Sequence, residues 1–160
     1  MPAITPCLWF DGQAEEAARF YVALFPNSRV ISTDAAPEGT PGGRSDVPLT
    51  VEFELDGNRF TGLNGGPQFT FDEAISFQID CADQTEVDYY WNGLLADGGE
   101  ESMCGWLRDR FGVSWQVVPR RLVELMADDD PARASRAMQA MLQMRKIDIG
   151  AIEAAADAAS

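Results

Sequence analysis

The first half of the chain is predicted to run strand, helix, strand, strand, strand. Apolar residues recur at helical spacing between residues 13 and 25, and Leu49 to Leu55 alternates apolar and polar side chains. The Asp56-Gly57 pair supplies a hairpin turn after that strand, whereas Asp11 and Pro26 suit the two ends of the helix. The five elements are expected at residues 4–10, 13–25, 28–35, 49–55 and 59–63.

The second half repeats this order, which restricts the possible folds more than any other feature. A strand at 75–81 precedes Asp83-x-x-Glu86, which resembles a capping box, and the helix that follows ends at Gly98-Gly99. Three short strands are expected at 100–104, 106–111 and 113–119. The aromatic pairs Phe20-Tyr21 and Tyr90-Trp91 lie 70 residues apart on the two helices. Two copies of one unit explain this, although two amphipathic helices could also coincide by chance.

The remaining residues are predicted to be helical. Pro131 suits the first position of a helix, whose buried side is expected to carry Met138, Met141, Leu142 and Ile149. The final AAADAAS lacks bulky apolar side chains and is expected to fray. We therefore expect an α+β fold with a first unit at 1–70, a second at 71–119 and C-terminal helices at 120–160, all in one domain.

Composition limits the function. The chain has 160 residues, a formal net charge of −14 and no histidine. A strongly negative protein repels nucleic-acid backbones and anionic membrane surfaces, so neither is an expected partner. Three cysteines without a Cys-x-x-Cys pair, and no apolar segment of about 20 residues, favour a reduced cytoplasmic location.

Three sequence blocks carry a resemblance to a known family: ITPCLWFDGQAEEAARFY, VEFELDGNRFTGLNGGPQF and CGWLRDRFGVSWQVVP. With the Pro131–Met141 helix, they cover most of the chain. The sequence resembles the PhnB-like group of the vicinal oxygen chelate (glyoxalase/bleomycin resistance) superfamily, often labelled 3-demethylubiquinone 3-methyltransferase-like. This resemblance implies paired βαβββ units, curved sheets that enclose a cavity, and a homodimer that completes it, with exchange of units left open.

Metal-using members of that superfamily hold a divalent cation with four side chains. By resemblance, these positions fall near Pro6 or Cys7, Thr50 or Glu52, Ala74 or Ser76, and Gln116. Only Glu52 offers an anion, Gln116 offers a neutral oxygen and Cys7 a soft ligand, which is too few for a hard or a soft metal. We therefore expect no metal and no other cofactor.

A mostly apolar pocket with a few polar groups is what a small-molecule site requires. The residues expected to line it are Thr50, Asn64, Ser76, Gln78 and Gln116, with Trp9, Trp106 and Trp115 as aromatic walls. The alternative for the tryptophans is that at least two of them fill the core. Glu52 is the candidate catalytic acid or base, and the alternative is that it pairs with Arg59 across the hairpin.

The expected function is therefore metal-independent binding of a small molecule. The alternative is an enzyme on the same scaffold that uses Glu52 with amide partners at Asn64 and Gln116. Methyl transfer is not expected, because Asp11-Gly12 leads directly into a helix without the glycine-rich loop that holds a nucleoside cofactor at the end of a parallel sheet.

Overall fold

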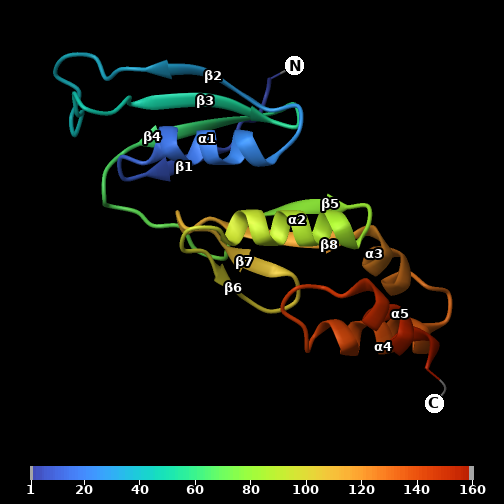
Figure 1. Cartoon of the computed structure of the whole chain (residues 1–160). Helices are drawn as coiled ribbons and strands as arrows, with labels where there is room; N and C mark the ends of the chain where they lie inside the picture. Colours follow the sequence, from blue (N-terminus) through green and yellow to red (C-terminus); the bar gives the residue numbers. More distant parts are fainter. Residues whose placement is uncertain (1, 159–160) are drawn as a thin grey trace. The chain divides into compact units, whose positions relative to one another are not determined.

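A computed structural model describes residues 2–158. The chain divides into two compact units, residues 1–71 and residues 72–160. Each unit contains a four-stranded sheet, and three more helices follow in the second unit. Figure 1 shows a helix on one face of each sheet. This arrangement confirms the predicted α+β class with a C-terminal helical extension.

The first unit contains one helix and four strands. Its elements are β1 (Cys7–Phe10), α1 (Ala14–Leu24), β2 (Arg29–Asp34), β3 (Thr50–Leu55) and β4 (Asn58–Asn64). The sheet order is β1-β4-β3-β2, with β1 parallel to β4 and the other pairs antiparallel. The predicted order of elements is therefore confirmed, with boundaries shifted by no more than a few residues.

The two faces of this sheet differ because strand side chains alternate. On β3, Val51, Phe53 and Leu55 are buried toward α1, and the ring of Phe53 stacks on that of Tyr21 with centroids 6.3 Å apart. Small residues let the helix approach closely, since a Cβ placed on Gly62 would lie 3.1 Å from the Cβ of Ala14. No helix of this unit packs on the other face, which carries Glu52.

The start of α1 differs from the sequence prediction. Asp11 does not cap the helix; the N-cap residue is Gln13, and its side chain makes no capping hydrogen bond. Instead, Oδ1 of Asn64 accepts a hydrogen bond from the backbone N–H of Ala14 at 2.9 Å. The cap therefore comes from a strand 50 residues away, which no local pattern can reveal.

The second unit repeats the topology. Its first elements are β5 (Ser76–Cys81), α2 (Gln84–Leu95), β6 (Glu100–Glu101), β7 (Trp106–Arg108) and β8 (Ser114–Pro119), in the sheet order β5-β8-β7-β6. Trp91 on α2 is 2% exposed and Tyr21 on α1 is fully buried, so the two aromatic positions noted in the sequence occupy equivalent places. The predicted cap is also present, because Asp83 accepts a hydrogen bond from the N–H of Glu86.

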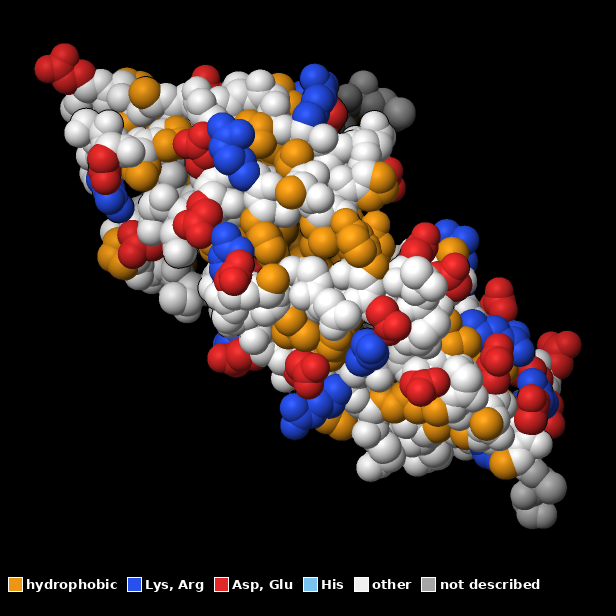
Figure 2. Space-filling model, in the orientation of Figure 1, with side chains coloured by type: hydrophobic (Ala, Val, Ile, Leu, Met, Phe, Trp, Pro, Cys, Tyr) orange, Lys and Arg blue, Asp and Glu red, His pale blue; other side chains and the backbone are white. Residues whose placement is uncertain are grey.

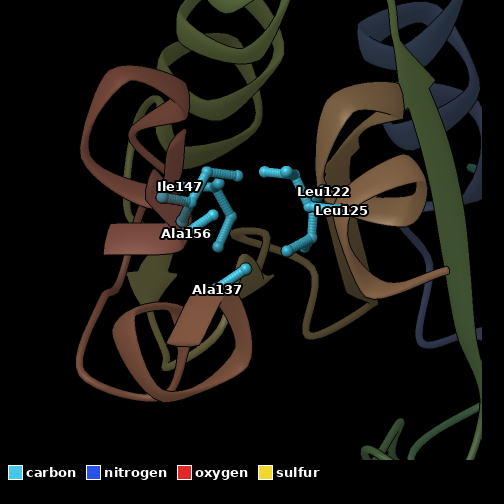
Figure 3. Close-up of a cluster of buried hydrophobic side chains, with 6 residues drawn as sticks. Leu122, Leu125, Ala137, Ile147 and Ala156 are labelled. Atoms are coloured by element: carbon cyan, nitrogen blue, oxygen red, sulfur yellow. The ribbon is translucent and has the colours of Figure 1, made fainter. Parts of the chain in front are cut away.

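Three helices complete the second unit: α3 (Arg120–Met126), α4 (Pro131–Met141) and α5 (Ile149–Asp157). They enclose a cluster of buried side chains, and in Figure 3 Leu122 and Leu125 on α3 point toward Ile147 and Ala156. The segment before α5 is tied to α2 by Gln84, whose amide donates to the Ile147 carbonyl at 3.0 Å and accepts from the Ile149 N–H at 2.8 Å.

Two predictions about this extension were wrong. Met138 and Leu142 are 40% and 43% exposed, and the buried residue of α4 is Ala137. The segment expected to fray instead forms α5 as far as Asp157, where Ala156 is buried and its carbonyl accepts two hydrogen bonds from Arg136. Small alanines pack here because the helices approach closely. Residues 159–160 of that segment lie outside the described part.

Between residues 2 and 158, no helix has the length and apolar character needed to cross a membrane.

Candidate functional site

The helix-free face of the first sheet gathers Glu52 with side chains from its neighbouring strands. Strand register places Thr61 opposite Glu52, Cys7 opposite Thr61, and Ser32 on the other side of Glu52. Because directly opposed residues share a face, these four residues form one row across all four strands. The alternating pattern of 49–55 therefore predicted the orientation of Glu52 correctly.

Glu52 is held by a hydroxyl group and lies near a guanidinium group. The Oγ1 hydroxyl of Thr61 lies 2.8 Å and 3.0 Å from the two carboxylate oxygens, to which it donates. Nη2 of Arg59 lies 3.7 Å from Oε2, and the Glu52 side chain is 25% exposed. The pairing with Arg59 considered from the sequence is thus present, and it coexists with a half-buried carboxylate on the open face of the sheet.

Cys7, in the same row, is not set up as a nucleophile. Partial burial raises the pKa of its thiol, and the negative charge of Glu52 raises it further. The reactive form of cysteine is the thiolate, which both effects disfavour. Cys81 in the second unit is still less reactive, because burial, with Glu86 and other carboxylates adding to it, raises its pKa to about 12.

Trp9 and Thr50 belong to the next row of the same face. Each lies opposite Leu63 on β4. The indole N–H of Trp9 donates to the Gly66 carbonyl at 2.9 Å, and its ring meets Phe69 edge-on at 4.9 Å. A Cβ on Gly65 would lie 2.3 Å from the indole, so glycine is required there. Trp9 therefore lies on the same face of the sheet as Glu52, which is the position that an aromatic wall of a pocket at Glu52 requires.

Asn64 lies on the other face of the sheet. Besides capping α1, its amide donates to the Pro48 carbonyl at 2.8 Å, and the residue is 7% exposed. Thr61 and Leu63 share the face of Glu52, and Asn64 alternates with Leu63. The structure thus gives Asn64 a packing role and does not bring it together with Glu52.

The second sheet carries a chain of amides on its corresponding face. Gln116 donates to the Ser76 hydroxyl at 2.8 Å, and Gln78 donates to Gln116 at 3.4 Å. Trp106 lies opposite Gln116 on β7, so it shares this face and is half-buried. Four of the expected binding residues therefore lie together in this unit.

Trp115 is not among them. It is 3% exposed on the helix side of the sheet, and its indole N–H donates to Oδ2 of Asp109 at 2.9 Å. The other oxygen of Asp109 accepts from the N–H groups of Phe111 and Val113. Trp115 is therefore a core residue, whereas Trp9 and Trp106 are half-buried, so one of the three tryptophans fills the core and not the two or more of the alternative. Since neighbouring strand residues face opposite ways, Trp115 and Gln116 could not both have lined one face.

One cavity lies wholly within the second unit. It has a volume of about 550 Å³ and borders β5, β8 and α3. The lining residues are Gln78, Ile79, Asp80, Val118, Arg120, Val123 and Glu124. Sequence analysis identified only Gln78 among them, because α3 is brought to the sheet by tertiary packing.

The side chains do not fit a divalent metal ion. In each unit, the described residues contain no group of three His, Cys, Asp or Glu side chains that could hold one. Glu52 shares its row with the Thr61 hydroxyl, the protonated Cys7 thiol and Ser32. The amide of Gln116 donates a hydrogen bond to Ser76. Hard cations require several oxygens including carboxylates, and softer metals require imidazole or thiolate.

The sequence family is decided by a match that spans residues 2–118. The matching model is described as 3-demethylubiquinone-9 3-methyltransferase. The chain belongs to this family, to which the PhnB label of a similar solved protein also points. The match ends just before α3, so the helices α3 to α5 follow the family domain.

Solved structures agree with this assignment. A Bacillus cereus PhnB protein, labelled 3-demethylubiquinone-9 3-methyltransferase, is 32% identical over 74% of this chain and 99% of its own, with a TM-score of 0.66. Protein PA1353 from Pseudomonas aeruginosa is 21% identical over 74% of this chain and 98% of its own, with a TM-score of 0.60, and shows the shared fold. No curated protein matches the chain.

Proposed function

We propose that this PhnB-like protein binds a small organic molecule without a metal, at the sheet faces that α1 and α2 do not cover. The observation that carries the proposal is the half-buried carboxylate of Glu52, oriented by Thr61 on a face that α1 does not cover. A polar group in such a position costs free energy unless it is satisfied, and the Thr61 hydroxyl, with the Arg59 guanidinium 3.7 Å away, leaves accepting capacity for a ligand.

The surrounding side chains support a ligand with both polar and apolar parts. Trp9 and Leu63 supply apolar surface beside Glu52, and the amides of Gln78 and Gln116 supply neutral donors and acceptors in the second unit. Binding sites of this composition fix orientation with few polar groups and gain affinity from apolar contact. We extend the proposal to a cytoplasmic homodimer, as the family resemblance implies.

The methyltransferase label is not part of the proposal. A nucleoside cofactor is typically held at the carboxyl ends of a parallel sheet, next to a glycine-rich turn. In each sheet of this chain only one strand pair is parallel, β1 with β4 and β5 with β8. The turn after β1 contributes a single glycine, Gly12, before α1.

Glu52 also supports a second candidate, an enzyme in which this carboxylate transfers a proton. The favouring observation is that Thr61 fixes the carboxylate with its oxygens on the open face of the sheet. A positioned carboxylate is a common general acid or base. The two candidates differ in whether the bound compound is recovered unchanged.

A panel of small metabolites, screened by the shift in melting temperature, tests the proposal. For a compound that binds, we expect Glu52→Gln to weaken the affinity about tenfold, the typical loss for a charged hydrogen bond. Glu54→Gln is the matched control, because Glu54 lies on the same strand and face but pairs with Arg29. Equal affinities for both variants and the unmodified protein would contradict the proposal, and conversion of the compound detected by mass spectrometry would favour the enzyme.

A further inference from the structure

The cavity beside α3 is built partly from residues that follow the family domain. β5 and β8 supply its floor through Gln78, Ile79, Asp80 and Val118, whereas α3 supplies one wall. The family match ends at residue 118, and α3 begins at Arg120. This wall is therefore an addition of this chain's C-terminal extension.

Apolar side chains give the cavity a surface for a hydrocarbon body. Val118 contributes from the strand, where it also packs against the helical cluster, and Val123 contributes from α3 with 59% of its surface exposed. A volume of about 550 Å³ lies within the range of small-molecule sites. Covering Val123 would remove apolar surface from water, which favours occupancy.

The polar side chains of the cavity offer hydrogen-bond acceptors to a ligand. Oδ2 of Asp80 accepts from Arg120 at 2.8 Å, and Oε2 of Glu124 accepts from Arg121 at 3.2 Å. Gln78 donates its amide N–H to Gln116. The side chains of Asp80 and Glu124 are 65% and 63% exposed, so their other carboxylate oxygens, like the amide oxygen of Gln78, remain accessible to a ligand. The lining thus presents three acceptor oxygens.

The charges of the cavity favour a positive ligand. Its lining contains two carboxylates and one guanidinium group, and Arg121, which pairs with Glu124, also pairs with Glu153, so the sum stays at one net negative charge. The second unit as a whole has 17 Asp and Glu against eight Arg and Lys. Figure 2 shows acidic side chains spread over the visible surface, with basic ones between them. A field of this sign attracts cations and repels anions.

We propose that the cavity binds a small organic monocation with an apolar body, of which a primary alkylamine is the simplest case. An ammonium group has three N–H donors and no acceptor, and the lining residues Asp80, Glu124 and Gln78 offer it acceptor oxygens. The alkyl body lies against Val118 and Val123. This inference rests on the proposed function and names a ligand class for one part of the site.

The test compares three probes with the same tail: n-octylammonium, n-octanol and octanoate at pH 7 and fixed ionic strength. Binding is followed on the whole ¹⁵N-labelled protein by the shifts of its backbone amide signals. We expect octylammonium to bind most tightly and octanoate least, with shifts confined to α3, β5 and the end of β8. Failure of octylammonium to bind, or tighter binding of octanoate, would overturn the inference.

Two variants separate local from general electrostatics. We expect Asp80→Asn and Glu124→Gln each to weaken octylammonium binding about two- to fivefold, as for exposed charge pairs, and to leave octanol unchanged. Asp97→Asn is the control, because it removes one negative charge from the same unit at a position outside the cavity. The Asp97 side chain is 82% exposed, and asparagine tolerates the positive φ of 61° at this residue. An equal loss in the control would overturn the local site.

The outcome also distinguishes this inference from the proposed function. If octylammonium shifts amides around Glu52 on β3 and β4 and leaves α3 unchanged, the α3 cavity is not the site, and the proposed function stands. If no metabolite of the panel binds in a Glu52-dependent way while octylammonium still occupies the α3 cavity, the proposed role of Glu52 is contradicted and the α3 cavity remains a binding site.

Discussion

At the scale of single residues, the structure separates side chains that face the open side of the sheet from those that serve packing. Glu52, Trp9 and Thr50 share the open face of the first sheet. The amide of Asn64 instead accepts one hydrogen bond and donates another inside the unit. A buried amide that satisfies two backbone groups is costly to remove, because both groups lose their partner together.

This cost gives a first prediction. Asn64→Ala should lower the free energy of unfolding by about 1–3 kcal/mol, since the N–H of Ala14 then lies buried without an acceptor. Urea denaturation followed by circular dichroism measures the change. Asn92→Ala serves as the control, because Asn92 is exposed on α2. A loss as large in the control would contradict the structural role of Asn64.

A second prediction concerns the row of Cys7 and Glu52. Burial is the larger cause of the raised pKa of the Cys7 thiol, and the charge of Glu52 raises it further. Removing that charge should therefore lower the pKa and increase the thiolate fraction at pH 8. We expect Glu52→Gln to speed alkylation of Cys7 by iodoacetamide about two- to fivefold, as for an exposed charge pair. Peptide mass spectrometry follows the site, and Glu54→Gln, on the same face and strand, should leave the rate unchanged.

At the scale of elements, the extension is attached to the family domain by one side chain in particular. Gln84, in the first turn of α2, bridges the Ile147 carbonyl and the Ile149 N–H at the start of α5. Two ion pairs flank this bridge, Lys146 with Asp88 at 2.9 Å and Arg145 with Glu101 at 3.5 Å. Exposed ion pairs add little. The extension is held by the amide bridge, the buried cluster and two backbone hydrogen bonds of 2.8 Å, from the Cys104 N–H to the Met144 carbonyl and from the Gly105 N–H to the Arg145 carbonyl.

Gln84→Ala should therefore loosen the extension more than the sheets. We expect faster hydrogen exchange in α5 and the segment before it, with a loss of about 1–2 kcal/mol for the two bridging hydrogen bonds. Exchange measured by mass spectrometry resolves the two regions. Gln143→Ala, at an exposed position close to the same segment, is the control. Unchanged protection of α5 in Gln84→Ala would show that the cluster and the backbone hydrogen bonds of Cys104 and Gly105 hold the extension without Gln84.

At the scale of the whole molecule, the charge is unbalanced. Twelve basic residues face 26 acidic ones, and repulsion among the excess carboxylates destabilises any compact state. Salt screens this repulsion over a distance of about 10 Å at 0.1 M. The same salt weakens the exposed ion pairs, but each of those contributes less than about 1 kcal/mol.

Raising NaCl from 10 mM to 300 mM should consequently raise the melting temperature by a few degrees. Calorimetry measures the shift. Choline chloride at equal ionic strength should act alike, because the effect is screening and needs no specific cation. A melting temperature that falls in both salts would mean that the ion pairs outweigh the general repulsion.

The sequence by itself determined the elements and their order. Alternation on β3, the hairpin turn at Asp56-Gly57 and the cap at Asp83 all depend on neighbours within a few residues, so these local patterns predict them. The βαβββ order, found twice, predicted the fold, and the resemblance of three sequence blocks indicated the family. The orientation of Glu52 followed from the same alternation, as did the shared face of Ser76, Gln78 and Gln116.

Only the tertiary structure decided which distant groups meet. Asn64 caps a helix 50 residues away, Trp115 turns inward to Asp109, and α3 folds back to wall a cavity on β5 and β8. The alanines near Asp157 pack because α4 and α5 approach closely, which makes small side chains suitable for burial there. Such contacts join residues that are far apart in the sequence, so they depend on how the whole chain folds. The type and spacing of neighbouring residues do not predict them.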